Sequence, residues 1–426
     1  MTDERSPPVD ERDALDRLPP QVLDKAARPG RIRGIALDTW AAARASPRAA
    51  GRELREGVRQ ARALHSRERR LVREALYGMV RGHVRWTHVL DADDPVVLWL
   101  AQLVESGLPV ERARELAPAP YERLEQASLP PALHHGLAPP IVAALVDAWG
   151  EGPTRAFLEA SDSRAPVTLR ANLAVVKSRE AAAERLAREG IETVPGRHVP
   201  TSLHVVGRAN LAASRAFRDG VVEVQDEGSQ WLAEEVPAVA RVWDMCAGAG
   251  GKSLALAARG MEVFATDVRG GALAEARRRA RRACVELATA RLEPEGALPD
   301  AVHAFGPEAV LVDAPCSGTG VLRRHPEHRW LLDEHSLVEL PRLQGRILDR
   351  AVAGVPEGGV LVYGTCSVLP QENEDVVDAF LARHPDFERA GEPLRLAPHT
   401  HGTDGFFAQR LSRSHPLHST ARSAER

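Results

Sequence analysis

Apolar residues follow two different patterns along this chain, one in its first third and another in the remainder. Over residues 31–155 they recur at three- and four-residue spacing, as in R-R-L-V-R-E-A-L-Y-G-M-V at 69–80, and strand-like alternation is scarce. The stretch before them is polar and contains two Pro-Pro pairs. The pattern therefore predicts a flexible arm over 1–30, followed by an all-α domain over 31–155.

The pattern changes near residue 163, where short alternating runs begin. T-L-R-A, S-L-H-V and V-V-E-V are strand-like, and S-R-E-A-A-A-E-R-L-A-R-E-G, between the first two, has the spacing of a helix. Ser178 can cap the start of that helix and Gly190 can end it. We expect a small α/β (RRM-like) module over 163–225.

From residue 226 to residue 411, short apolar runs alternate with helical segments. The runs are R-V-W-D, E-V-F-A-T-D, A-V-L-V-D and V-L-V-Y, each rich in β-branched or aromatic residues. This order is typical of an open parallel sheet with crossover helices on both faces. The predicted fold class is α/β, with a Rossmann-like domain over 226–411. Residues 412–426 are polar and are predicted to be a disordered tail.

Composition narrows the setting of the protein. The chain has 426 residues, of which 44 % are apolar, and its longest apolar runs are far shorter than a membrane span. The N-terminus lacks the apolar segment of a secretory signal. Four cysteines without a C-x-x-C pair argue against a disulfide framework and a zinc ribbon. We therefore expect several domains in a monomer, a cytoplasmic location and no membrane partner.

The net charge of −3 hides a basic region. Between Arg31 and Arg85 there are fourteen Arg and five acidic residues, and a second basic run, A-R-R-R-A-R-R-A, lies at 276–283. Such clusters suit a polyanion such as RNA. The alternative is a solvated helix face, because the chain has only three Lys and uses Arg as its usual cation. RNA is the predicted partner of the first region, and the choice stays open for the second run.

A glycine-rich loop follows the first strand of the Rossmann-like region. W-D-M-C-A-G-A-G-G-K-S at 243–253 leads from that strand into a helix, where glycines admit a ligand close to the backbone and the helix start offers N–H donors. The loop is neither a P-loop, which would need Gly in place of Cys246, nor a G-x-G-x-x-G motif. The cofactor-binding residues predicted in this loop are Cys246, Ala247, Gly248, Gly250, Gly251 and Lys252.

The second strand of this region ends in A-T-D, with Asp267 at its carboxyl end. A carboxylate there can accept both ribose hydroxyls of an adenosine group, which suits NAD and S-adenosylmethionine alike. A pair of strand-end cysteines and the lack of a dinucleotide motif favour S-adenosylmethionine. The alternative is that Asp267 merely caps the following helix.

Two of the four cysteines lie in matching places, each just after an apolar strand. Cys316 lies in V-D-A-P-C-S-G-T-G and Cys366 in V-Y-G-T-C-S-V-L-P. A thiolate that adds to carbon 6 of cytosine makes carbon 5 nucleophilic enough to accept a methyl group, and a second cysteine can assist when the first departs. Asp313 is placed to hold the ring nitrogen and the exocyclic amine as charge develops. The sequence therefore predicts a catalytic pair.

These motifs resemble those of the RsmB/NOP (Sun/Fmu) family of RNA cytosine-5 methyltransferases. D-A-P-C-S-G-T-G and T-C-S-V-L-P-Q-E-N-E are similar to its two cysteine motifs, and C-A-G-A-G-G-K-S to its cofactor motif, normally C-A-A-P-G-G-K-T. V-Q-D-E-G-S-Q-W, R-R-H-P-E and D-G-F-F-A are similar to further motifs, so that the likeness spans about 165–411. The resemblance implies a class I methyltransferase domain that binds S-adenosylmethionine and methylates carbon 5 of a cytosine in RNA.

The resemblance also implies roles for single residues. Cys366 would be the nucleophile, with Cys316 and Asp313 completing the catalytic set and Asp313 also near the cofactor. In DNA cytosine methyltransferases the Pro-Cys motif attacks instead, which would make Cys316 the nucleophile. S-R-E-R-R-L-V-R-E-A-L-Y-G-M-V-R at 66–81 resembles the NusB-like RNA-binding domain of bacterial rRNA enzymes. This likeness favours small-subunit rRNA over tRNA as the substrate.

One feature of the family is missing from its expected place. Its members usually have an acidic residue after strand three, which holds the adenine amine. This chain has V-E-L-A-T-A-R-L-E-P there, in which Glu286 and Glu293 lie near that place but out of register. The alternative function is therefore an RNA-binding ribosome-assembly factor with weak or no cofactor binding.

The remaining candidate ligands are assigned to other roles. The spacing of His325 and His328 suggests a metal, but no further ligand accompanies them in sequence. We predict no metal site and expect these histidines to line an RNA groove. Cys284 and the thiol of Cys246 are predicted to pack in the interior.

Overall fold

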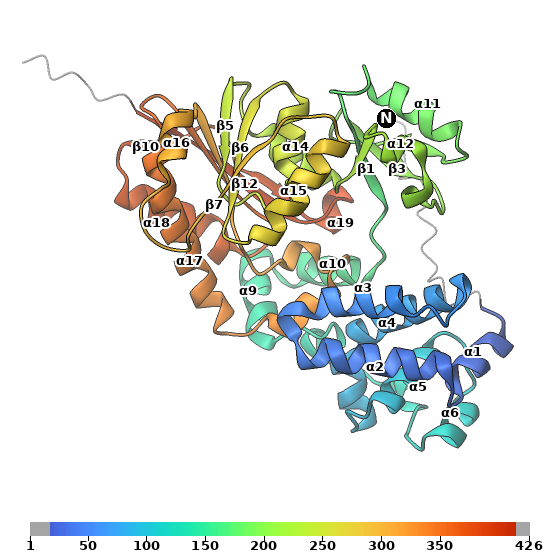
Figure 1. Ribbon diagram of the computed structural model, residues 1–426. Helices are drawn as coiled ribbons and strands as arrows, with labels where there is room; N and C mark the ends of the chain where they lie inside the picture. Colours follow the sequence, from blue (N-terminus) through green and yellow to red (C-terminus); the bar gives the residue numbers. More distant parts are fainter. Residues whose placement is uncertain (1–17, 415–426) are drawn as a thin grey trace, which may run out of the picture. The chain divides into compact units, whose positions relative to one another are not determined.

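The computed structural model describes residues 18–414 of the chain, which form two compact units. The helical unit contains the chain up to Ala165 together with residues 317–337, and the sheet unit contains residues 166–316 and the chain from Val338 onward (Figure 1). Among the described helices, none is both long and apolar enough to cross a membrane.

The helical unit is built on the long helix α4, whose start is fixed by a capping box between His65 and Glu68. Asp94 caps α5 by accepting hydrogen bonds from two backbone N–H groups. The helical character and the fit to a NusB-like fold agree with the sequence prediction. Its elements are α1 (Pro20–Ala27), α2 (Arg31–Ala45), η1 (Pro47–Ala49), α3 (Ala50–Gln60), α4 (Ser66–Leu90), α5 (Pro95–Glu105), α6 (Val110–Leu116), α7 (Arg123–Gln126), α8 (Pro131–His134), α9 (Pro139–Trp149), α10 (Glu151–Asp162), η3 (Thr319–Val321) and η4 (Pro326–Leu331).

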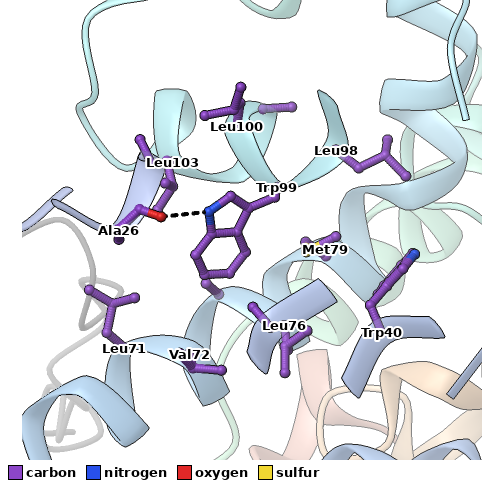
Figure 2. Packing of buried hydrophobic residues seen from close by; sticks show 14 of the residues in the cluster. Ala26, Trp40, Leu71, Val72, Leu76, Met79, Leu98, Trp99, Leu100 and Leu103 are labelled. Atoms are coloured by element: carbon purple, nitrogen blue, oxygen red, sulfur yellow. Dashed lines mark hydrogen bonds between the residues drawn. The ribbon is translucent and has the colours of Figure 1, made fainter. Parts of the chain in front are cut away.

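The flexible arm predicted over 1–30 is wrong where it meets α1. Leu23, Ala26 and Ala27 of this helix are buried in the core, and the Trp99 indole donates a hydrogen bond of 3.0 Å to the Ala26 carbonyl (Figure 2). Pro20 suits the first turn of a helix, and these three apolar positions form one stripe along it. Residues 1–17 lie outside the described part of the chain.

Part of the sheet unit is a small antiparallel sheet with two helices, as the sequence predicted. Its strand order, β2-β3-β1-β4, and its β-α-β-β-α-β succession are those of a ferredoxin-like domain. Ser178 caps α11 as expected. The elements are β1 (Thr168–Ala171), α11 (Arg179–Ala187), β2 (Thr193–Pro195), β3 (Ser202–Val205), η2 (Leu211–Ala213), α12 (Arg215–Arg218) and β4 (Val222–Val224).

The larger sheet has the order β10-β12-β9-β8-β5-β6-β7, with β11 beside β12. The five strands from β9 to β7 are parallel, as predicted, whereas β12 pairs antiparallel with β9 and with β10. The strands are β5 (Arg241–Asp244), β6 (Glu262–Asp267), β7 (Ala288–Arg291), β8 (Ala309–Asp313), β9 (Val360–Thr365), β10 (Phe387–Arg389), β11 (Leu394–Leu396) and β12 (Phe406–Arg413). Because β12 ends at Arg413, the tail predicted from residue 412 begins too early.

Helices cover both faces of this sheet, so the doubly wound class is confirmed. Helices α16, α17 and α18 pack against the face of the sheet that includes Trp243 and Tyr363. Their contacts with it are made by Val302, Leu348 and Phe380. Helices α14 and α15 lie together on the other side (Figure 1). The helices are α13 (Glu227–Glu234), α14 (Gly251–Ala258), α15 (Gly270–Arg282), α16 (Asp300–Phe305), α17 (Ser336–Ala351), α18 (Glu374–Arg383) and α19 (Pro398–His401), with short turns η5 (Val352–Gly354) and η6 (Pro370–Glu372).

Residues 317–337 interrupt the domain predicted over 226–411, because they pack within the helical unit. The buried Arg329 guanidinium donates to Asp162 at 2.6 Å and to the His135 carbonyl at 3.0 Å. The Trp330 ring meets Trp40 edge-on, with 5.3 Å between ring centroids. The chain therefore leaves the sheet unit directly after Cys316 and returns near the start of α17.

Candidate active site

The two candidate catalytic cysteines meet because neighbouring parallel strands end side by side. Strands β8 and β9 pair with Asp313 opposite Gly364, and each cysteine follows its strand within a few residues. The two Sγ atoms lie 3.3 Å apart, and neither cysteine is part of a disulfide. The carboxyl edge of the sheet thus brings the predicted pair together.

Lys252 and Asp313 form a short ion pair at the same edge. The Lys252 Nζ donates to Asp313 Oδ2 at 2.6 Å and lies over the Phe406 ring, 5.3 Å from its centroid. Burial by itself would lower the pKa of Lys252, but the charge and hydrogen bond of Asp313 outweigh it, and the pKa is raised. Cys366 adds to this rise, so the ammonium is close to the cysteine pair.

The glycine-rich loop has the open backbone that the sequence predicted. Gly248 and Gly250 have φ values of 55° and 79°, a region that favours glycine. A Cβ added at Gly250 would lie 2.9 Å from the Ala276 Cβ, so the turn packs closely against α15. The Gly248 N–H donates to Asp267 Oδ2 at 2.8 Å, which joins the loop to the end of β6.

Asp267 is almost fully buried and its carboxylate is held by Arg269. The Arg269 side chain donates from Nε and Nη2 at 3.1 and 3.2 Å, and its backbone N–H donates at 2.7 Å. Burial would raise the pKa of Asp267, but these hydrogen bonds outweigh it and lower the pKa. The Arg269 side chain itself is 70 % exposed, so it can move away when another donor takes the carboxylate.

Asp244, at the end of β5, belongs to this site although the sequence prediction omitted it. Its Oδ2 accepts a hydrogen bond of 2.5 Å from Ser253, whereas its buried Oδ1 has no hydrogen-bond partner among residues 18–414. Burial raises the pKa of Asp244 to about 7. An acidic residue at the end of the first strand, in W-D-M-C, was the signal that could have identified it.

The structure also corrects the register of the third strand. Strand β7 ends at Arg291, which pairs with Asp267 of β6. Glu293 therefore follows the carboxyl end of β7 by two positions and is exposed there, whereas Glu286 precedes the strand. Whether Glu293 takes the place of the family's strand-three acid therefore stays a prediction, whereas Glu286 lies at the opposite end of β7.

The loop that carries Cys366 is held by buried polar side chains. Thr365 donates to Asn373 Oδ1 at 2.6 Å, and Ser367 donates to Glu372 Oε1 at 2.8 Å. The other Glu372 oxygen accepts from Gln344 at 2.9 Å. Since these side chains are almost fully buried, the network fixes the backbone on both sides of Cys366.

Several predicted residues lie elsewhere. Cys284 does not pack inside, because it is exposed in a left-handed conformation (φ 53°) just after α15. Cys246 does pack against the core, and burial raises its pKa well above that of a free thiol. His325 and His328 belong to the helical unit, where they and Glu327 place possible ligand atoms within 4.8 Å of one another. The absence of a metal and their place in an RNA groove stay predictions.

Two family models match parts of the chain. Residues 232–412 match the model described as 16S rRNA methyltransferase RsmB/F, and residues 141–212 match the ferredoxin-like domain of RsmF/B-like methyltransferases. Over these residues the chain is similar to the RsmB/F methyltransferase family. The resemblance recognised from the cysteine and cofactor motifs is therefore confirmed.

Curated relatives carry the same family name. The chain is 33 % identical over 268 residues to ribosomal RNA small subunit methyltransferase B of Pectobacterium carotovorum, a match that covers 60 % of this chain and 61 % of the relative. The enzyme of the same name from Escherichia coli is 34 % identical over 273 residues, covering 60 % and 62 %. The matched part thus spans about three fifths of each relative.

Solved structures show the same fold. The protein PH0851 superposes with a TM-score of 0.71 at 23 % identity, covering 93 % of this chain and 99 % of that one. NSun6 from Pyrococcus horikoshii superposes with a TM-score of 0.56 at 18 % identity, covering 66 % and 99 %. At these identities the likeness concerns the fold.

Proposed function

We propose that this protein transfers a methyl group from S-adenosylmethionine to carbon 5 of a cytosine in RNA, most specifically in small-subunit rRNA. One observation carries the proposal: two thiols 3.3 Å apart lie at adjacent strand ends, beside a partly buried Lys252–Asp313 pair. Addition and elimination at carbon 6 of a pyrimidine need a thiolate, and the Lys252–Asp313 pair offers charge to the ring.

The residues around the glycine-rich loop fit S-adenosylmethionine. Asp267 can accept the ribose hydroxyls once Arg269 turns outward, and Glu293 can accept the adenine amine. The unpartnered Asp244 Oδ1 suits the ammonium of the methionine part. The loop from Cys246 to Gly251 leaves room for the ligand because of its glycines, and Lys252 and Asp313 border it. When bound, the cofactor supplies an electrophilic methyl group.

In the proposed reaction the Cys366 thiolate adds to carbon 6 of cytosine and forms a C–S bond. The Asp313 carboxylate accepts a hydrogen bond from the exocyclic amine, and from the ring nitrogen once that nitrogen has taken a proton, while electron density moves to carbon 5. Carbon 5 then takes the methyl group, and S-adenosylhomocysteine is released. A base next removes the proton from carbon 5, the C–S bond breaks, and the thiolate of Cys366 is restored. Cys316, whose sulfur touches that of Cys366, assists this release.

RNA as the substrate is supported by charge and by the relatives' names. The fourteen arginines between Arg31 and Arg85 lie in the helical unit. In the second basic run, Arg279 and Arg282 bind the buried Glu223, whereas Arg277, Arg278 and Arg281 are exposed. This run therefore combines a structural role with a solvated face, and tRNA stays the second candidate substrate.

Methylation of RNA by the purified protein tests the proposal. We expect labelled methyl groups to enter small-subunit rRNA, and bisulfite sequencing to locate them at a cytosine. Calorimetry with S-adenosylmethionine is the companion measurement. Absence of binding at millimolar cofactor would favour the alternative, an RNA-binding assembly factor. The missing strand-three acid was the ground for that alternative, and we propose that Glu293, two positions after the end of β7, takes its place.

A further inference from the structure

Three aromatic rings from distant parts of the sheet unit form a cluster to which the proposed chemistry gives no role. The His198 ring stacks on the Trp231 indole, with 4.8 Å between centroids and 20° between planes. His401 meets these two rings edge-on, at 6.0 and 6.3 Å. We call His198, Trp231 and His401 the aromatic platform. All three are half-buried, so that each ring keeps part of its surface in solvent.

The platform is held by a buried carboxylate rather than by apolar packing alone. Glu227 accepts hydrogen bonds from the backbone N–H groups of His198 and Val199, at 2.7 and 3.0 Å, and from His204 Nε2 at 3.1 Å. The His198 ring donates from Nε2 to the His401 carbonyl at 3.0 Å. Burial would raise the pKa of Glu227, but these hydrogen bonds outweigh it and lower the pKa to about 2. The loop with His198 is thus fixed on α13 over the whole neutral range.

The platform lies at the same edge of the sheet as Cys366. Trp231 is followed in α13 by Leu232, which packs against Gly364 of β9, where an added Cβ would come within 2.7 Å of the leucine side chain. His401 comes five residues before Phe406, at the start of β12, and this start pairs with the end of β9. The elements that carry Trp231 and His401 therefore contact Gly364 and Thr365, the two residues before Cys366.

The chemistry of the platform suits a flat, uncharged ligand. Burial lowers the pKa of His401, and the nearby His198 lowers it further, so that this imidazole is neutral at neutral pH. Single-stranded RNA is recognised by stacking of unpaired bases on Trp, Tyr, Phe and His rings.

We infer that His198, Trp231 and His401 form a stacking site for an unpaired nucleobase that neighbours the target cytosine in the RNA strand. The inference rests on the proposed function for the identity of the strand, because that function places the target base beside Cys366. The protein would thus bind a second base of the RNA at residues that are separate from those proposed for catalysis and for the cofactor.

The test measures binding of a fluorescently labelled short oligocytidine to the full-length protein by anisotropy. We expect Trp231→Ala to weaken the affinity roughly tenfold, and Trp231→Phe to restore most of it, because phenylalanine keeps a ring for stacking. His384→Ala is the matched control, since His384 is a half-buried histidine packed between Phe380 and Phe387, outside the platform. It should bind the oligonucleotide like the wild type.

An abasic oligonucleotide separates stacking from a structural effect. A single abasic nucleotide at the stacked position should weaken binding to the wild type, and the same substitution should weaken binding to Trp231→Ala no further. Unchanged oligocytidine affinity in Trp231→Ala would overturn the inference. The inference would also be overturned if the abasic nucleotide weakened binding to Trp231→Ala as much as binding to the wild type. Failure of Trp231→Phe to restore binding would overturn it as well. Cofactor binding measured on the same variants tests the proposed function separately, because the platform predicts no change there.

Discussion

The two loops that carry the cysteines end neighbouring strands, yet they are held in different ways. The loop after β9 is closed by its own unit, through hydrogen bonds from Thr365 to Asn373 and from Ser367 to Glu372. The loop after β8 leaves the sheet unit at once, and the residues that follow Cys316 are anchored among helices by Arg329 and Trp330.

The difference suits the roles proposed for the two cysteines. A nucleophile needs a fixed approach to carbon 6, and a buried hydrogen-bond network around Cys366 provides it. The release step follows after the adduct has formed, so its cysteine can lie on a segment whose other end belongs to the helical unit. Strand register brings the two loops together, and the contacts of each loop set how its cysteine is held.

The largest expected effect separates the two cysteines directly. Cys366→Ala should lower methylation more than about a thousandfold and abolish the covalent RNA adduct, because it removes the nucleophile. Cys316→Ala should instead accumulate the adduct, since addition proceeds and release is impaired. Denaturing gel electrophoresis of labelled RNA with each variant measures both. Methylation by Cys366→Ala would contradict these roles and would make Cys316 the nucleophile.

The anchor of the β8 loop gives the next effect. Arg329→Ala removes a buried guanidinium that binds Asp162, whose remaining partner is His135 at 2.6 Å, and should lower the free energy of unfolding of the helical unit by about 3 kcal/mol. Urea unfolding followed by circular dichroism measures this loss. We further expect slower adduct release with unchanged adduct formation.

A surface ion pair provides the control for Arg329. Arg342→Ala removes an exposed contact with Glu339 and should change stability by less than about 0.5 kcal/mol. Equal losses in the two arginine variants, or an effect of Arg329→Ala on adduct formation, would contradict the distinction between the two loops.

The β9 loop should respond in the opposite manner. Asn373→Ala removes the acceptor of Thr365 and a donor to the Ser367 carbonyl, which should cost about 1–3 kcal/mol of stability. Adduct formation should slow while release is preserved, because the change lies beside the nucleophile. Rapid-quench measurement of adduct formation tests this. Glu374→Gln, which affects a surface pair with Arg395, is the control and should leave the rate unchanged.

The smallest effect concerns Asp244, at the end of β5. Its pKa of about 7 lies above its ordinary value, so its charged form gains population as the pH rises through 7. Affinity for S-adenosylmethionine should therefore rise between pH 6 and pH 8, by at most about tenfold per pH unit. Asp244→Asn should weaken binding and flatten this dependence, as calorimetry at several pH values would show.

The same shift has a consequence for stability in the absence of cofactor. Because the folded protein holds the Asp244 proton more tightly than the unfolded chain, the stabilisation is full below about pH 4 and is lost as the pH rises through about 7. Asp244→Asn should remove this loss. A pH-independent cofactor affinity in the wild type would contradict the place proposed for Asp244.

The sequence by itself determined the order of the domains, the parallel strands and the residues at their ends. Apolar runs of strand length fix β5, β6, β8 and β9, and in a parallel sheet their carboxyl ends share one edge. For this reason Cys316, Cys366, Lys252 and Asp267 could be assigned to one site from the order of residues alone. Local periodicity also identified the helical region, because each helix shows its own apolar stripe.

Only the tertiary structure decided features that depend on partners distant in sequence. The burial of α1 depends on its contact with Trp99. The chain leaves the sheet unit after Cys316 because the following segment packs around Arg329. The place of Glu293 follows from the end of β7 at Arg291. The aromatic platform joins residues more than 200 positions apart, from His198 to His401. Local sequence carries no record of such contacts, since hydrogen bonds and packing between remote segments form only when the whole chain has folded.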